Sequence, residues 1–200
     1  MQETELKFSL HDLEAYETVI RNLGPARRVR EQTNHYFTGD EGGRLQNGEA
    51  MVRLREEDGG FRLAFKEGLV VEGACFRCRE VEEDLPPETG RALLAGTRQP
   101  GETGGEASRA LTASLGEATL SIAGTSRTKR VELDLPGGVV LQADHAVFPG
   151  GREDFELEIE TADPGEAERE LRRLLGRRGI VPKAQTKTKY RRFLEAAGLA

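Results

Sequence analysis

Several short segments of this chain alternate apolar and charged residues, and within each segment the charges at every second position have the same sign. These like-charged pairs and triplets are Glu3/Glu5, Arg53/Arg55, Arg62/Lys66, Glu80/Glu82 and Glu156/Glu158/Glu160. Successive side chains of a β-strand point to opposite faces, so each segment predicts a strand with one apolar and one ionic face.

For a single strand, the ordinary outcome is a sheet whose ionic face lies in water. Like charges crowded on one face destabilise a sheet, however. The repetition therefore predicts about eight strands that close into a barrel with an ionic lumen, with the apolar faces turned outward under helices.

Turn and capping signals divide the rest of the chain. A helix is expected from about Leu13 to Leu23, with Asp12 as its N-cap and Gly24-Pro25 as its stop. Asp58-Gly59-Gly60 joins two alternating runs as a hairpin. Further helices are expected from Pro87 to Leu94, in a short stretch that ends near Leu115, after the capping box at Asp163, and in the C-terminal tail. The expected strands are Thr4–Phe8, His35–Phe37, Met51–Arg55, Phe61–Lys66, Cys75–Leu85, Thr119–Ile122, Thr128–Leu135, Val139–Ala143 and Phe155–Glu160. The Gly-rich loop from Gly96 to Gly105 is interpreted as a connection inside one domain that spans residues 1–200.

Composition excludes several classes of protein. The 200 residues carry a formal net charge of −6, which argues against non-specific nucleic-acid binding. No run of about 18 apolar residues is present and the N-terminus is acidic, so a cytoplasmic protein without a membrane partner is expected. Cys75 and Cys78 are too few for a disulfide framework or a four-thiolate zinc site. Motifs of serine hydrolases, zincins and P-loop enzymes are missing from the sequence.

The charged side chains of an ionic lumen indicate which ligands it can bind. Rows of Arg and Lys bind phosphate oxygens, and rows of carboxylates hold Mg²⁺ or Mn²⁺, hard cations that prefer oxygen ligands. A polyanion together with a metal ion would neutralise both kinds of row. The pattern therefore predicts binding of a phosphate-rich anion and a divalent metal.

The opening Glu3-Thr4-Glu5-Leu6-Lys7 resembles the ExExK signature of the CYTH superfamily, also called triphosphate tunnel metalloenzymes. Later segments resemble the further motifs of that family in the same order, over essentially the whole chain. They are Tyr36-Phe37, Val52-Arg53-Leu54-Arg55, Phe65-Lys66, Arg127 to Arg130, Asp144, Glu156 to Glu160 and Thr188-Lys189-Tyr190.

The resemblance implies an α+β fold with a closed eight-stranded antiparallel tunnel and peripheral helices. It also implies metal-dependent hydrolysis of inorganic triphosphate, thiamine triphosphate or a nucleoside triphosphate, with inorganic triphosphate favoured. Metal ligands would be Glu3, Glu5, Glu158 and one of Glu156 or Glu160, and the groups closest to catalysis would be Glu5, Glu158 and Asp144. The phosphate-binding residues would be Lys7, Arg53, Arg55, Arg62, Lys66, Arg127, Arg130, Lys187 and Lys189. Mg²⁺ or Mn²⁺ is the implied cofactor.

Two positions leave alternatives open. Cys78 stands where the family usually has an Arg, so either a bulge turns Arg77 or Arg79 inward or one phosphate contact is missing. On the strand near residue 130, Val131, Leu133 and Leu135 place Arg130 on the polar face, whereas the family motif favours Arg127.

Two other functions remain as alternatives to a triphosphatase. One is a class IV-type adenylate cyclase, and the other is a non-catalytic module that binds polyphosphate or nucleotide. The partner in each case is a small molecule that contains a triphosphate. The sequence does not define its organic part or the oligomeric state.

Overall fold

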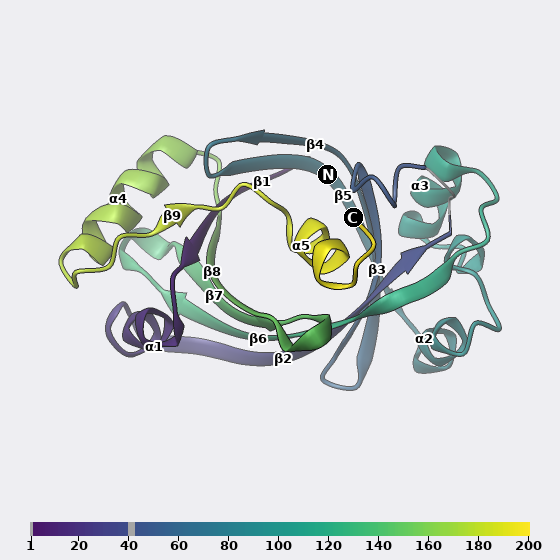
Figure 1. Cartoon of the computed structure of the whole chain (residues 1–200), viewed down its shortest axis with the longest axis horizontal. Coiled ribbons are helices and arrows are strands. Elements are labelled where there is room, and N and C mark those ends of the chain that lie inside the picture. Colours follow the sequence, from purple (N-terminus) through teal and green to yellow (C-terminus); the bar gives the residue numbers. More distant parts are fainter. Residues whose placement is uncertain (1, 40–42) are drawn as a thin grey trace.

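The computed structural model describes residues 2–39 and 43–200 and shows a closed antiparallel β-barrel with helices on its outside (Figure 1). Strands follow the order β5-β4-β3-β2-β6-β7-β8-β1, and pairing of β5 with β1 closes the ring. The short strand β9 pairs with Phe8 and Ser9 of β1, beyond the residues that pair with β5. An eight-stranded α+β barrel was predicted from the sequence, and the structure confirms it.

The elements of the described chain are, in order, β1 (Gln2–Leu10), α1 (Leu13–Asn22), β2 (Ala26–Thr38), β3 (Ala50–Glu57), β4 (Gly60–Glu72), β5 (Cys75–Leu85), α2 (Pro87–Leu94), α3 (Glu106–Leu115), β6 (Ser121–Asp134), β7 (Val140–Val147), β8 (Glu153–Glu160), α4 (Pro164–Gly176), β9 (Lys183–Ala184) and α5 (Lys189–Ala196). Single 3₁₀ turns lie at Pro100–Glu102, Pro136–Gly138 and Pro149–Gly151.

Two predicted helix starts have the expected caps. The Asp12 carboxylate accepts a hydrogen bond from the backbone N–H of Ala15 at 2.8 Å. Asp163 accepts one in the same way from Glu166, at 3.0 Å. A side-chain oxygen at this position satisfies a backbone donor that the helix cannot, which fixes where α1 and α4 begin.

The apolar strand faces point outward and are covered by helices on two sides of the barrel. One core joins the outward residues of β1, β6, β7 and β8 to α1 and α4, around Phe8, Leu133 and Leu157. A second joins β2 to β5 with α2 and α3, around Leu63 and Leu111. Figure 1 shows these two helix pairs at opposite ends of the long axis. Burial of apolar area on the outside therefore stabilises a barrel whose inside is polar.

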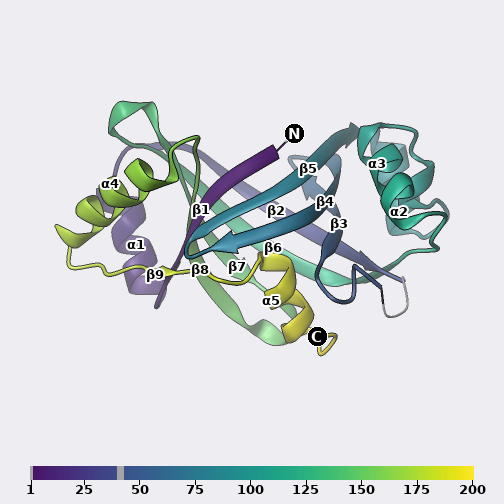
Figure 2. The same cartoon turned by 90° about the horizontal axis from the view of Figure 1, so that it is seen from above.

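A third, smaller core lies at one opening of the barrel. Tyr190, Phe193 and Leu194 of α5 pack against Tyr36 and Met51, which belong to the inward faces of β2 and β3. Figures 1 and 2 both show α5 against this opening. The C-terminal helix therefore covers one end of the lumen and brings its first residues to the interior.

The structure corrects two strand predictions. The two segments expected at Thr119–Ile122 and Thr128–Leu135 are parts of one long strand, β6, which begins at Ser121 and ends at Asp134. Its pairing with β2 shifts register beside Gly124, where an added Cβ would lie 3.0 Å from the ring of Phe193. β2 also begins at Ala26, well before the predicted His35. The sequence prediction missed the first half of this strand because that half is charged or polar and lacks an apolar alternation.

Candidate active site

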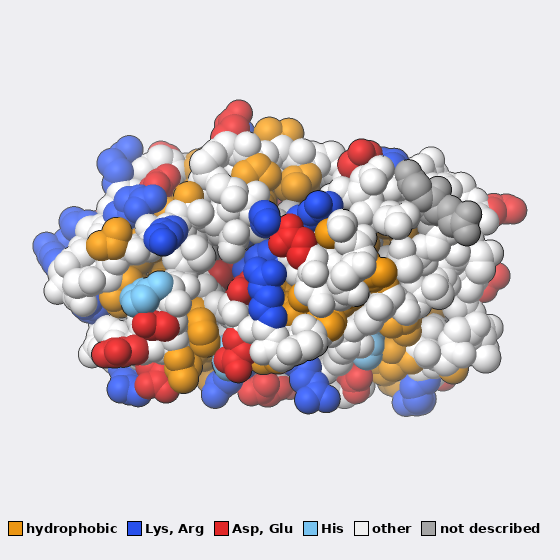
Figure 3. Space-filling view, in the orientation of Figure 1, with side chains coloured by type: hydrophobic (Ala, Val, Ile, Leu, Met, Phe, Trp, Pro, Cys, Tyr) orange, Lys and Arg blue, Asp and Glu red, His pale blue; other side chains and the backbone are white. Residues whose placement is uncertain are grey.

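The inward faces of the strands line a cavity of about 280 Å³ that is rich in charge. The space-filling view shows acidic and basic side chains together in the hollow at the centre of the molecule (Figure 3). The ionisable groups of its wall are Glu3, Glu5, Lys7, Arg30, Glu49, Arg53, Arg55, Arg62, Lys66, Glu67, Glu80, Glu82, Arg130, Glu158, Glu160 and Lys189, with Tyr36, Cys78 and Tyr190. The lumen is therefore ionic, as the alternation of like charges predicts.

On one side of the lumen, three buried carboxylates form a tight group. Asp144 of β7 and Glu156 and Glu158 of β8 each offer an oxygen within 4.8 Å of the others. Adjacent strands place them there, because Asp144 pairs with Glu156 in the β7–β8 register and Glu158 follows two residues later on the same face. Such a group of hard oxygen donors is of the kind that divalent cations bind.

Four cations already contact this carboxylate group. Arg130 of β6 binds Asp144 through two hydrogen bonds of 2.8 and 2.6 Å and reaches Glu158 at 2.6 Å. Lys7 of β1 lies 2.6 Å from Glu158 and 2.9 Å from Glu5. Lys189 contacts all three members of the group, and Arg192 pairs with Glu156. Burial alone would raise the pKa of Glu158, but Lys189, Lys7 and Arg130 outweigh it and hold that pKa well below its usual value.

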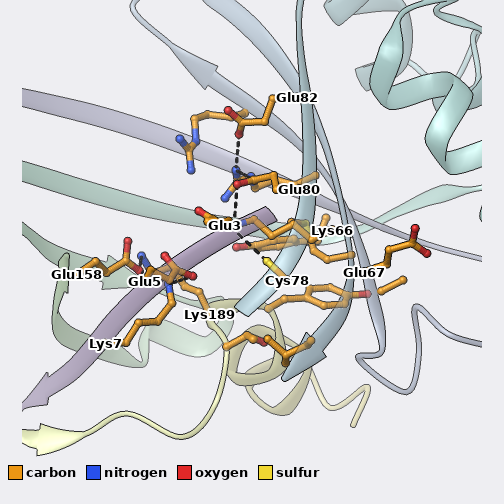
Figure 4. Close-up of a pocket in the computed structure, with 18 of the residues that line it drawn as sticks. Glu3, Glu5, Lys7, Lys66, Glu67, Cys78, Glu80, Glu82, Glu158 and Lys189 are labelled. Carbon is orange, nitrogen blue, oxygen red and sulfur yellow. Dashed lines mark hydrogen bonds and ion pairs between the residues drawn. The ribbon is translucent and has the colours of Figure 1, made fainter. Parts of the chain in front are cut away.

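A second group of charges lies across the lumen on β1, β3, β4 and β5. Lys66 Nζ contacts Glu3 Oε2 at 2.6 Å and Glu80 Oε2 at 3.0 Å, and Arg53 contacts Glu82 at 3.1 Å. Burial raises the pKa of Glu3 to about 7 against the attraction of Lys66, and the nearby Glu5 and Glu80 add to the rise. Figure 4 shows Glu3, Lys66, Cys78 and Glu80 together on this side, away from Lys7 and Glu158. Carboxylates here exceed the cations that neutralise them.

Arg55 differs from the other lumen cations in its partners. Within the described part of the chain, its side chain pairs only with the amide oxygen of Asn34, at 3.1 Å. Burial, Arg53 and Arg130 all lower the pKa of Arg55, which means that they disfavour its positive charge. A half-buried guanidinium without a carboxylate partner, beside two further guanidinium groups, is a group that a bound anion would stabilise.

Most of the residues singled out from the sequence lie at the lumen. Glu3, Glu5, Lys7, Arg53, Arg55, Lys66, Arg130, Glu158 and Lys189 line it. Asp144 and Glu156 are fully buried just behind its wall, in contact with Lys189. Arg62 and Glu160 lie at the rim, where Arg62 pairs with Asp84 at 2.7 Å and Glu160 is exposed.

The structure corrects the placement of two candidate phosphate ligands. Arg127 is exposed, whereas Thr128 and Arg130 are buried, so the parity of β6 places Arg130 in the lumen and Arg127 outside. Lys187 is exposed as well and pairs with Glu195 at 2.8 Å, outside the cavity. Neither residue can contribute to a site within the lumen in this arrangement.

Cys78 lies in the lumen wall, and neither neighbouring Arg replaces it. Its thiol donates a hydrogen bond to Glu3 Oε2 at 3.3 Å. Arg77 pairs with Glu72 and Arg79 with Glu67, both at 2.8 Å, and Arg79 is exposed. A register shift does occur here, but the one extra residue is on β4, between Glu67 and Val70. The bulge therefore leaves β5 in register, and no guanidinium from Arg77 or Arg79 enters the lumen.

We expect Cys78 to react slowly with thiol reagents in the native protein. Burial raises the pKa of its thiol to about 12, and Glu3 contributes to the rise, so little reactive thiolate forms near neutral pH. Alkylation by iodoacetamide near pH 8, followed by peptide mass spectrometry, should be at least about a hundredfold slower at Cys78 in native protein than in urea-unfolded protein. Equal rates in the two states would contradict the buried position.

Sequence reasoning missed three residues that shape the site. Asn34 and Arg30 lie on β2, where polar residues recur at every second position from Arg28 to Tyr36, and that recurrence could have identified them. Arg192 follows Lys189 by three residues in α5, so helical spacing places both on one face toward Glu156. The missed signal is a period-two recurrence of polar residues on β2 and a three-residue spacing of two cations on α5.

The fold and this lumen define a closed antiparallel β-tunnel protein with an ionic interior. The chain belongs to the CYTH domain family, whose model matches residues 1–193. No protein in a collection of curated proteins matches it. Among the described residues, no helix has the length and apolar character needed to cross a membrane.

Solved structures with the same fold include two described as adenylate cyclase candidates. A putative adenylyl cyclase from Hippeastrum, described as having a dominant triphosphatase activity, is 22% identical with a TM-score of 0.89, and the match covers 96% of this chain and 95% of that one. A putative adenylate cyclase from Bacillus halodurans is 25% identical with a TM-score of 0.76, covering 96% and 98% of the two chains.

Proposed function

We propose that this protein is a divalent-metal-dependent triphosphatase that binds the triphosphate of its substrate inside the tunnel. The observation that carries the proposal is Arg55, a half-buried guanidinium that has an amide as its partner and faces Arg53 and Arg130. Two or three phosphate groups would supply the anionic charge that this group of arginines lacks. Arginine binds phosphate through paired charge-assisted hydrogen bonds, which fits this role.

The carboxylates of the lumen fit a divalent metal by their chemistry. All are hard oxygen donors, and the Asp144, Glu156 and Glu158 oxygens converge within 4.8 Å. The pKa of Glu3 rises to about 7 because burial and neighbouring carboxylates disfavour its charge, and a cation would relieve this. We propose Glu3, Glu5, Glu158 and Glu156, with Asp144, as the residues that would hold Mg²⁺ or Mn²⁺. Glu160 is a weaker candidate because it is exposed at the rim.

The reaction we propose is hydrolysis of a phosphoanhydride bond. A water oxygen forms a bond to phosphorus, the bridging P–O bond breaks, and inorganic triphosphate gives phosphate and pyrophosphate. A bound metal ion would neutralise charge on the phosphoryl oxygens and lower the pKa of a water. Arg53, Arg55, Lys66 and Arg130 would hold the phosphates and stabilise the negative charge of the transition state. Because its pKa lies well below the usual value, Glu158 stays ionised and does not donate a proton.

A substrate panel tests the proposal. Inorganic triphosphate, thiamine triphosphate, ATP and pyrophosphate would each be incubated with Mg²⁺ or Mn²⁺, and released phosphate and cyclic AMP would both be measured. A triphosphatase releases phosphate from at least one triphosphate faster than it forms cyclic AMP from ATP. Faster formation of cyclic AMP would instead identify a cyclase. Binding of triphosphate without any product would identify a binding module.

We also expect hydrolysis to be lost when either the metal or its ligands are removed. Excess EDTA, Glu3→Gln or Glu5→Gln should each lower the rate by at least about a hundredfold, because several kcal/mol of transition-state stabilisation depend on the bound cation. The matched control is Glu72→Gln, which neutralises an exposed carboxylate on β4 that pairs with Arg77. Phosphate release at different metal concentrations is the measurement. Undiminished activity in EDTA would contradict metal dependence.

A further inference from the structure

Lys189 occupies the centre of the group of carboxylates that best suits a metal ion. Its Nζ lies 2.5 Å from Asp144 Oδ2, 2.7 Å from Glu156 Oε1 and 3.3 Å from Glu158 Oε1. These are the three residues whose oxygens converge within 4.8 Å. One ammonium therefore makes the contacts that a divalent cation would make with the same three carboxylates.

The charges of this region leave no place for an additional cation. Five carboxylates (Glu5, Asp144, Asp154, Glu156 and Glu158) face five cations (Lys7, Arg130, Arg152, Lys189 and Arg192). The group is therefore neutral without a metal ion. Addition of a divalent ion would leave two net positive charges in a largely buried region, whereas exchange of one ammonium for the ion leaves only one. Burial makes an uncompensated charge costly, so exchange is favoured over addition.

Lys189 is the cation best able to leave. Arg130 holds Asp144 through two hydrogen bonds, Arg192 is almost fully buried, and Lys7 is fixed in β1 between Glu5 and Glu158. Lys189 is the first residue of α5, directly after its N-cap Thr188, and its side chain has the largest exposed fraction, 14%, of the four cations that contact the three carboxylates. It also lines the cavity, so its flexible stem can turn toward the lumen without movement of the barrel.

We propose that Lys189 is an internal counter-ion that a divalent metal displaces from Asp144, Glu156 and Glu158, and that the released ammonium then enters the lumen as a phosphate ligand. Metal binding would thereby add one positive charge to the surface that meets the substrate. The inference rests on the proposed metal site and adds an order of events, in which metal binding precedes full phosphate binding.

Metal binding without substrate tests the exchange. Mn²⁺ alone would be titrated into the full-length protein and followed by calorimetry or by the electron paramagnetic resonance signal of free Mn²⁺. Lys189→Met should bind Mn²⁺ at least about tenfold more tightly than wild type, because the ion no longer competes with an ammonium. Lys187→Met is the matched control, since Lys187 is exposed in the same segment and pairs with Glu195. Affinity equal to or weaker than that of wild type would overturn the proposal.

Lys189→Met removes one of the cations that neutralise the buried carboxylates and lowers stability in the absence of metal, so two further measurements are needed. Mn²⁺ should raise the melting temperature of this variant more than that of wild type, and an equal or smaller rise would overturn the exchange. In wild type, acetylation of the Lys189 amine, measured by peptide mass spectrometry, should become at least about threefold faster when Mn²⁺ is added. An unchanged rate would also overturn it.

These results are separable from the failure of the proposed function. Exchange of Lys189 for Mn²⁺ in a protein that hydrolyses no triphosphate would leave the inference standing and refute the triphosphatase. Normal metal-dependent hydrolysis with unchanged Mn²⁺ affinity in Lys189→Met would refute the exchange alone.

Discussion

Replacement of Arg55 by Ala is expected to weaken triphosphate binding by at least about tenfold, because a charge-assisted hydrogen bond to phosphate contributes about 1.5–3 kcal/mol. In the free protein the same change removes a cation that is repelled by Arg53 and Arg130 and held by the Asn34 amide. The free energy of unfolding should therefore change by less than about 1 kcal/mol. Loss of ligand affinity without comparable loss of stability is the signature of a residue held in place for its ligand.

Thermal unfolding with and without inorganic triphosphate measures both effects of Arg55→Ala at once. A ligand that binds the native state raises its stability by mass action, so wild type should gain several degrees in melting temperature and the variant much less. Arg79→Ala is the control, because Arg79 is exposed on β5 and pairs with Glu67. Wild-type affinity in Arg55→Ala would show that Arg55 does not bind the phosphates, and the proposed function would lose its main support.

The barrel could be predicted from the sequence because the apolar and ionic faces that require it are visible within each short segment. A strand with Glu3 and Glu5 on one face and Leu6 and Phe8 on the other needs an apolar cover outside and opposite charges inside. Antiparallel register then places Lys7 directly opposite Glu158. The two residues are 151 positions apart in the chain, yet each is marked as ionic by its own neighbours.

The partners of individual charges could not be predicted in the same way. Arg127 and Arg130 both lie in a charged run. The parity of Val131, Leu133 and Leu135 favours Arg130, but its partner Asp144 follows only from the pairing of β6 with β7. The isolation of Arg55 and the three contacts of Lys189 depend on side-chain geometry across strands and on the position of α5. Local sequence gives the sign and face of a charge, while its partner depends on tertiary structure.

Replacement of Arg130 by Met is expected to cause the largest loss of stability. Arg130 is buried and binds both Asp144 and Glu158, and removal of one partner from a buried ion pair costs about 3–5 kcal/mol because the other charge is left uncompensated. Arg127→Met is the matched control on the same strand, where an exposed Arg gives way to the same side chain. Its free energy of unfolding should stay within about 0.5 kcal/mol of wild type. Urea unfolding near pH 7 measures the difference.

The loss in Arg130→Met should also shrink as the pH falls. In wild type, Arg130 and the nearby lysines counteract burial and hold the pKa values of Asp144 and Glu158 below their ordinary values of 3.8 and 4.5. Carboxylates with lowered pKa values stabilise the native state above their unfolded pKa, and this stabilisation is lost as the pH falls through the folded value. Without Arg130 both pKa values rise, so protonation near pH 4 removes the uncompensated charge from the variant while wild type still keeps its pairs. The difference in free energy of unfolding should therefore be smaller near pH 4 than near pH 7. A difference that does not change with pH would mean that lost packing, and not the two carboxylates, determines what Arg130 contributes.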